Sequence, residues 1–137
     1  MVKHYDWRCF DITRLVGAKA GRRVSVCIPA RDEQATVAEV VRVVHDELMA
    51  DKGLVDELVV VDDGSTDATS KEAANAGARV VTLPQPAGKG EAMWQGLQAT
   101  SGDVVAYCDA DIYNFAPRFV VGLVGPLLTD SSVALVK

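Results

Sequence analysis

The pattern of apolar and polar positions changes from irregular to regular at Val24. Residues 1–23 keep no helical or strand period, so they predict an irregular lead-in. Its basic cluster, Lys19, Arg22 and Arg23, is expected to form a solvated edge. Beyond it, short apolar runs alternate with stretches of helical period, which predicts one folded unit over residues 24–137.

Five short apolar runs predict β-strands. The run Val59–Val61 consists of valine alone, which is typical of a strand buried on both faces in a parallel sheet. Pro29 is expected to end the first strand, because proline lacks the N–H that a ladder needs. The strands are expected at residues 24–29, 57–63, 78–83, 103–109 and 133–137.

Helical spacing fills the stretches between these runs. In residues 35–50, five apolar side chains recur at i, i+3, i+4, i+7 and i+11 and form one face: Val37, Val40, Val41, Val44 and Leu48. His45 lies beside that face and is expected at its boundary with solvent. Pro126 predicts a kink in the last helix. The remaining helices are expected at residues 65–77, 88–102 and 117–129.

The alternation of strand and helix predicts the α/β class, with a mostly parallel sheet, right-handed crossovers and flanking helices. A length of 137 residues fits one domain. The strand expected at residues 133–137 has no element after it to cover its far face, so the fold is expected to be truncated at the C-terminus.

Composition and charge narrow the function classes. The formal net charge of −5 argues against nucleic acid or an anionic membrane as the main partner. No apolar run approaches the roughly 20 residues of a membrane span, and residues 1–10 lack the apolar core of a signal peptide. A cytoplasmic protein is therefore expected. Three cysteines without a C-x-x-C pair argue against a disulfide framework or a zinc site.

Polar side chains follow three of the predicted strands, at the edge where ligands bind to open α/β sheets. Arg31, Asp32 and Glu33 follow the first strand, residues 62–67 (DDGSTD) follow the second, and residues 109–111 (DAD) follow the fourth. A further segment, GKGE, places Lys89 at the start of a helix. Because the carboxyl ends of parallel strands share one edge, these residues are expected to converge.

Each of these features has a simpler explanation when it is taken alone. Thr66 and Asp67 could only cap the next helix. Arg31 could be an edge charge, the GKG segment a flexible turn, and a lone D-x-D is common. The gathering of four such segments at one edge is what favours a binding site.

The chemistry of this edge points to a cation and a phosphate ligand. Neighbouring carboxylates repel one another, and a hard divalent cation such as Mg²⁺ or Mn²⁺ relieves that repulsion. Lys89 could add a point charge to the phosphates, while Glu33 and Asp63 could accept hydrogen bonds from a ribose or a base. The signatures of dinucleotide and P-loop sites are absent. The set suits a nucleoside diphosphate bound through a metal.

Four segments in this order resemble the GT-A-fold, Rossmann-like, family-2-like glycosyltransferases. They are VSVCIPARDEQATV, DELVVVDDGSTDAT, GKGEAMWQGLQATSGDVV and DAD. The further segments GARVV and FVVGLVGPLL resemble the actinobacterial branch that transfers glucose to 3-phosphoglycerate. The resemblance extends from about Val16 to the end of the sequence.

The resemblance implies a metal-dependent, retaining transfer of glucose from UDP-glucose to 3-phosphoglycerate. It implies that Asp109 and Asp111 hold the metal, with Ala110 between them, and that Asp111 and Lys89 assist catalysis at the leaving diphosphate. No residue is assigned as nucleophile or base. The positions that match the nucleotide pocket are Pro29, Ala30, Arg31, Glu33, Asp63 and Gly64, together with Lys89, Asp109 and Ala110.

The sequence also departs from that family. Arg31 and Asp32 stand where the family commonly has Leu-Asn, and Asp63 stands where it often has serine, which leaves the donor base open. Members of the family continue past the strand that matches residues 133–137. The continuation carries the acceptor site and a metal-binding histidine, so this sequence is expected to be the nucleotide-sugar-binding half. A homodimer is a further expectation from the resemblance.

Other functions stay open at this point. The sequence could encode a noncatalytic nucleotide-sugar-binding module, or a family-2 glycosyltransferase with another acceptor. A phosphoryl-transfer receiver is disfavoured, because its acceptor aspartate follows the third strand, where this sequence has TLPQ. A dehalogenase-type phosphatase needs D-x-D after the first strand, where this sequence has PARD.

Overall fold

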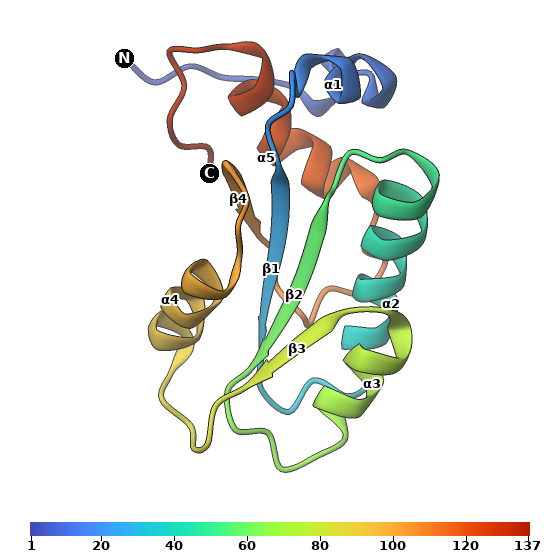
Figure 1. The fold of residues 1–137 in the computed structure, drawn as a ribbon, viewed down its shortest axis with the longest axis vertical. Helices are drawn as coiled ribbons and strands as arrows, with labels where there is room; N and C mark the ends of the chain where they lie inside the picture. Colours follow the sequence, from blue (N-terminus) through green and yellow to red (C-terminus); the bar gives the residue numbers. More distant parts are fainter.

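Four parallel strands form the sheet, in the order β3-β2-β1-β4 (Figure 1). The computed structural model describes residues 1–137. The strands are β1 (Val24–Ala30), β2 (Glu57–Asp62), β3 (Arg79–Thr82) and β4 (Val104–Tyr107). The helices are η1 (Trp7–Cys9), α1 (Ile12–Ala18), α2 (Val37–Arg42), η2 (Val43–Asp51), α3 (Thr69–Ala76), α4 (Lys89–Ala99) and α5 (Pro117–Thr129).

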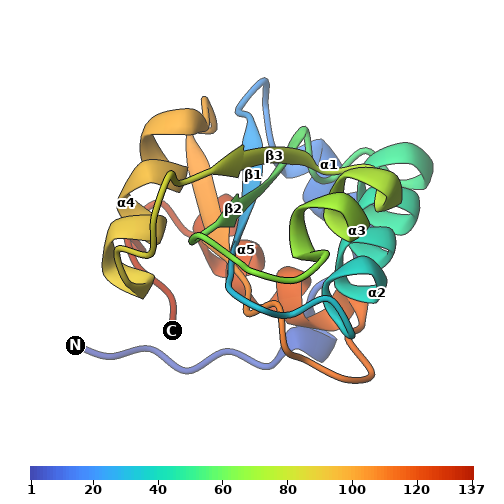
Figure 2. The same cartoon turned by 90° about the horizontal axis from the view of Figure 1, so that it is seen from below.

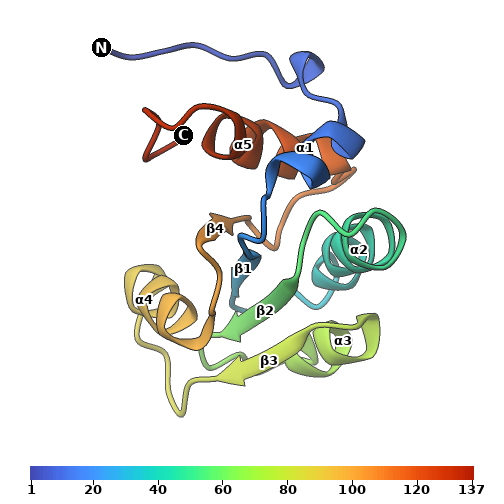
Figure 3. The same cartoon turned by 45° about the horizontal axis from the view of Figure 1, so that its top comes forward.

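Helices cover both faces of this sheet, with α4 on one face and α2 and α3 on the other (Figure 3). Successive residues of β1 point to opposite faces. Val26 and Ile28 join the large core beneath α2 and α5, whereas Cys27 joins a smaller core beneath α4. The α/β class with a parallel sheet, predicted from the alternating pattern, is confirmed.

The order of the strands places a crevice between β1 and β4. The chain adds β2 and β3 on one side of β1, and then α4 carries it across to β4 on the other side. Ligand sites in open α/β sheets form outside the carboxyl ends of the strands at such a reversal. The sheet therefore positions the loops after β1 and β4 next to each other.

The helix predicted at residues 35–50 is present, with its second half in π-helical geometry. It consists of α2 and η2, and its five predicted apolar side chains are all fully buried: Val37, Val40, Val41, Val44 and Leu48. His45 is 39% exposed and lies at the boundary with solvent, as expected. No helix of the structure combines the length and the apolar character needed to cross a membrane.

The helix predicted from residue 65 begins later, at Thr69 of α3. The preceding residues form a loop because side chains of other segments bind its backbone. Asp32 Oδ1 accepts a hydrogen bond from the Thr66 N–H at 2.8 Å, and Gln34 Oε1 accepts one from the Ala68 N–H at 3.1 Å. The N-cap residue of α3 is Ala68, and Asp67, one residue before it, accepts a hydrogen bond from the N–H of Thr69, the first residue of the helix.

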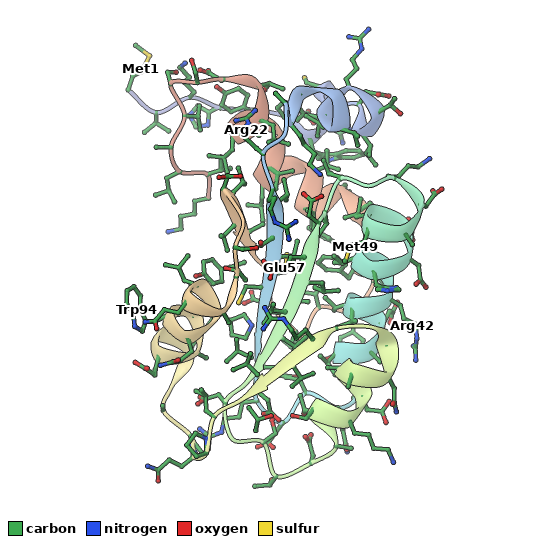
Figure 4. All side chains as sticks on the ribbon, viewed as in Figure 1. Met1, Arg22, Arg42, Met49, Glu57 and Trp94 are labelled. Atoms are coloured by element: carbon green, nitrogen blue, oxygen red, sulfur yellow. The ribbon has the colours of Figure 1, made fainter.

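The prediction that residues 1–23 are irregular and end in a solvated basic edge is wrong in two respects. The lead-in contains α1, whose Ile12, Leu15 and Val16 follow the helical spacing that the sequence already shows. Lys19 is buried and bonds the Asp56 carboxylate at 2.7 Å. Arg22 donates to backbone carbonyls at the end of α5, because carbonyls at a helix C-terminus lack partners within the helix (Figure 4).

The strand predicted at residues 133–137 is absent, and that prediction is wrong. Residues 130–137 contain neither helix nor strand, since none of the four strands pairs with them. A strand exists only where a neighbour accepts and donates its backbone hydrogen bonds. Before this segment, α5 runs through Pro126 and ends at Thr129.

Replacing Gly96 of α4 by alanine is expected to destabilise the protein, although alanine favours helices. Ala92 and Gly96 face the sheet, whereas Trp94 points away from it (Figure 4). A Cβ at Gly96 would collide with the Cys27 Sγ and lie 3.1 Å from Val61 Cγ2. Overpacking lowers the free energy of unfolding by about 1–3 kcal/mol. This cost exceeds the gain of about 1 kcal/mol that alanine has over glycine in helix propensity.

Urea unfolding of Gly96→Ala beside Gly90→Ala measures this effect. Gly90 is the matched control, because a Cβ there meets no atom within 4 Å and the change is expected to stabilise α4. Equal shifts of the unfolding midpoint in both variants would contradict the close packing of α4 on β1.

Candidate functional site

A cleft of about 260 Å³ lies at the carboxyl ends of β1, β2 and β4, beside the first turn of α4. This edge is at the bottom of Figure 1 and faces the viewer in Figure 2. Two cationic and four acidic side chains line the cleft, so its charge is negative overall. The lining residues are Pro29, Ala30, Arg31, Glu33, Asp63, Gly88, Lys89, Ala92, Asp109, Ala110 and Asp111.

The expected convergence of polar strand ends is confirmed. All of the predicted site residues line this one cleft except Gly64, which lies beneath Pro86. Two lining residues were missed, Gly88 and Ala92. Gly88 stands inside the GKG segment and could have been included, whereas nothing in the sequence distinguishes Ala92 from an ordinary helix residue.

Lys89 and Asp109 form an ion pair across the cleft. Lys89 Nζ lies 2.7 Å from Asp109 Oδ1, which connects the start of α4 to the loop after β4. The hydrogen bond and the charge of Asp109 raise the pKa of the Lys89 ammonium, with a smaller contribution from Asp111. Both side chains are more than half exposed, so the pair is weak and a stronger ligand for either partner can replace it.

Glu33 shows the excess of negative charge most clearly. Partial burial raises the pKa of its carboxyl group, and the charges of Asp111, Asp67 and Asp32 raise it further. No cation in the protein bonds Glu33. A cationic ligand that enters the cleft would relieve this repulsion.

The loop after β4 presents its two aspartates through a fixed residue between them. Ala110 is buried, and its carbonyl oxygen accepts a hydrogen bond from Thr36 Oγ1 at 2.7 Å. Asp109 and Asp111 are both exposed on this loop. Thr36 is a positioning residue that sequence reasoning missed, because the contact spans 74 residues and no local pattern signals it.

Asp63 lines the cleft but its carboxylate is already engaged. The side chain is buried, and its two oxygens accept hydrogen bonds from the backbone of the loop before α4. The donors are the N–H groups of Ala87, at 2.7 Å from Oδ1, and of Gly88, at 2.9 Å from Oδ2. In this arrangement Asp63 holds a loop of the protein.

The residues of the cleft fit a hard divalent cation as partial ligands. No group of three or more histidine, cysteine, aspartate or glutamate side chains is placed to enclose an ion. Asp109 and Asp111 are exposed carboxylates at the cleft, and Mg²⁺ is commonly bound through one or two carboxylates, waters and substrate phosphates. The fit therefore requires oxygens from a phosphate ligand.

The cysteines take no part in this site. Cys27 and Cys108 are buried, and burial raises the pKa of their thiols to about 11 and about 12. A thiol is nucleophilic as the thiolate, so both behave as small apolar side chains, as expected. Cys9 is exposed on η1, outside the lining of the cleft.

Glu33→Gln is expected to stabilise the ligand-free protein near pH 7. A carboxyl group whose pKa is raised by folding favours the folded state below the unfolded pKa, and that contribution is lost as the pH rises through the folded pKa. The amide removes the repulsion, so the free energy of unfolding rises by less than about 1 kcal/mol.

Urea unfolding at pH 7 and at pH 4 tests this sign. The advantage of Glu33→Gln shrinks at pH 4, because the carboxyl group of the parent protein is then largely protonated. Glu39→Gln, on an exposed position of α2, is the control. A lower stability of Glu33→Gln at pH 7 would contradict the repulsion.

Comparison with known proteins defines the class of this protein. The family described as "Glycosyl transferase family 2" matches residues 25–136, which includes every strand of the sheet except Val24, the first residue of β1. The chain belongs to this family. The sheet and its flanking helices are thus those of a family-2 glycosyltransferase domain, and the cleft lies where the strand order reverses, beside the D-x-D loop.

Within the family, the chain is similar to glucosyl-3-phosphoglycerate synthases. The synthase of Mycobacterium tuberculosis (strain ATCC 25618 / H37Rv) is 49% identical over 93% of this chain and 41% of its own length. A crystal structure of the M. tuberculosis synthase has a TM-score of 0.86 at 48% identity, covering 93% of this chain and 49% of that one. Another, in complex with Mn²⁺, UDP-glucose and phosphoglyceric acid, has a TM-score of 0.83 at 47% identity, covering 90% and 45%. The chain spans less than half the length of these relatives.

Proposed function

We propose that residues 24–137 form the donor-binding half of a GT-A glycosyltransferase that transfers glucose from UDP-glucose to 3-phosphoglycerate with retention of configuration. The observation that carries the proposal is the single cleft in which the D-x-D loop, Lys89 and the loop after β1 meet. The similar synthase that binds Mn²⁺, UDP-glucose and phosphoglyceric acid supports this choice of metal, donor and acceptor.

Asp109 and Asp111 are the proposed ligands of Mg²⁺ or Mn²⁺. When bound, the metal acts as a Lewis acid that neutralises charge on the leaving diphosphate. Lys89 leaves Asp109 and donates to the same phosphate oxygens, which stabilises the charge that develops as the glycosidic bond breaks. The start of α4 favours this arrangement, because helix N-termini attract phosphate.

The remaining lining residues form the proposed nucleotide pocket. Pro29, Ala30 and Arg31 supply one wall, and Glu33 offers carboxylate oxygens to ribose hydroxyl groups. Arg31 is exposed, so it can contact the nucleotide without losing an internal partner. No residue of the cleft is proposed as a nucleophile.

Calorimetric titration with UDP-glucose and with GDP-mannose, each with and without Mn²⁺, tests the donor and the metal. We expect UDP-glucose to bind in the presence of Mn²⁺ and to bind far more weakly without it. Preference for GDP-mannose would assign another donor. Tight binding of UDP-glucose that is independent of metal would contradict the proposal.

A noncatalytic nucleotide-sugar-binding module is the second candidate. The observation that favours it is the lining of the cleft, whose charged side chains suit a metal and a diphosphate and include none that is assigned to attack the sugar. Incubation with UDP-glucose, Mn²⁺ and 3-phosphoglycerate separates the two functions. Release of UDP with formation of a glucosylated product supports the transferase, and binding without any product supports the module.

A further inference from the structure

We infer that Asp63 is a positioning residue, which holds the loop of residues 86–88 and thereby places Lys89 at the diphosphate. The inference concerns how the cleft is built and rests on the proposed function for the role of Lys89. Two independent contacts of the loop support it, one through the carboxylate of Asp63 and one through the neighbouring Gly64.

The first contact is the pair of hydrogen bonds from the loop to Asp63. Its oxygens lie 2.7 Å from the Ala87 nitrogen and 2.9 Å from the Gly88 nitrogen, and the residue is only 4% exposed. Hydrogen bonds to a charged acceptor are about twice as strong as neutral ones, and burial protects them from water. The carboxylate therefore ties both backbone N–H groups to the end of β2.

The second contact is the close approach of Pro86 to Gly64. Gly64 has a φ of +68°, and a Cβ built there would lie 2.7 Å from the Pro86 nitrogen and 2.8 Å from its Cδ. The turn after β2 therefore packs against Pro86, while the carboxylate of Asp63 binds the next two residues of the loop. Together these contacts fix residues 86–88 to the end of β2.

Lys89 follows the held loop directly. Gly88, with a φ of +98°, is the residue before the first turn of α4, and its N–H is one of the two that Asp63 binds. Lys89 then reaches Asp109 at 2.7 Å across the cleft. The negative charge of Asp63 also lies at the N-terminus of α4, where it stabilises the helix. Asp63 thus sets where α4 begins and where the Lys89 ammonium can go.

Amide hydrogen exchange of the ligand-free protein tests the contact itself. In Asp63→Asn, the amides of Ala87 and Gly88 are expected to exchange roughly 10- to 100-fold faster, while amides of β2 keep their rates. Asp32→Asn is the matched control, because Asp32 holds the backbone of Thr66 in the neighbouring loop. That control should leave Ala87 and Gly88 unchanged. Unchanged exchange of both amides in Asp63→Asn would overturn the inference, whatever the protein binds.

A double-mutant cycle tests the route through Lys89. UDP binding in the presence of Mn²⁺ is measured for Asp63→Asn, Lys89→Met and the double variant. If Asp63 acts through Lys89, its substitution weakens UDP binding in the parent and has little further effect in Lys89→Met. An equal loss in both backgrounds would show that Asp63 does not act through Lys89 and would overturn the inference. Absence of UDP binding in the parent protein would instead refute the proposed function, and the exchange experiment would still decide whether Asp63 holds the loop.

Discussion

Asp111→Asn is expected to remove the metal-dependent part of UDP binding. The substitution keeps the size of the side chain and one oxygen, but it deletes one of the two carboxylates offered to the metal. With only Asp109 left, and that residue paired with Lys89, the cleft has no free carboxylate in the D-x-D loop. Loss of a group that only orients a metal ligand commonly lowers metal affinity 10- to 100-fold. Removal of a direct ligand is therefore expected to weaken Mn²⁺-dependent UDP binding at least about 100-fold.

Calorimetry with Mn²⁺ and UDP measures this loss, and urea unfolding reports whether the fold is intact. Asp111 is exposed, so the unfolding midpoint should change little. Asp51→Asn, at the end of η2 and outside the cleft, controls for the change of net charge. Retention of Mn²⁺-dependent UDP binding in Asp111→Asn would falsify the assignment of this residue to the metal.

Lys89→Met is expected to change two affinities in opposite directions. Without nucleotide, Lys89 competes with a metal for Asp109, at a separation of 2.7 Å. Removing an exposed ion pair of up to about 1 kcal/mol should strengthen binding of Mn²⁺ alone by up to about fivefold. With UDP present, the same variant loses a charged donor to phosphate, and affinity should fall roughly 10- to 100-fold.

Titration with Mn²⁺ alone, followed by titration with UDP at saturating Mn²⁺, separates the two effects. Lys71→Met on α3 is the control, because it removes the same charge from an exposed position outside the cleft. If Lys89→Met weakened the binding of both Mn²⁺ and UDP, or strengthened both, the result would contradict a lysine that exchanges Asp109 for phosphate.

The sequence by itself determined the sheet and one side of the main core. Valine runs such as Val59–Val61 are typical of strands buried on both faces in a parallel sheet, so they indicate β2 without its neighbours. Residues Val37–Leu48 show their buried face through local spacing alone. Both signals are short-range, and for that reason composition and period are sufficient to detect them.

The sequence also identified most of the lining of the cleft. Asp109, Asp111, Glu33 and Lys89 could be predicted because a general rule places the ends of parallel strands at one edge. That rule places residues at an edge of the sheet, but it does not predict the hydrogen-bond partner of each side chain there. Asp63 was predicted to line the nucleotide pocket, and it lines the cleft, but the hydrogen bonds that its oxygens accept from Ala87 and Gly88 could not be predicted.

Only the tertiary structure decided the contacts between distant segments. Arg22 binds carbonyls of α5 that lie more than 100 residues away, and Thr36 fixes the loop of Ala110 across 74 residues. The prediction of a strand at residues 133–137 was wrong for the same reason. Strand pairing depends on a neighbouring strand, and the local sequence pattern does not show whether one is there. Local periodicity reports which face of an element is apolar. The partner of a polar group is chosen by which segments the fold brings within hydrogen-bonding distance, and that is a property of the whole chain.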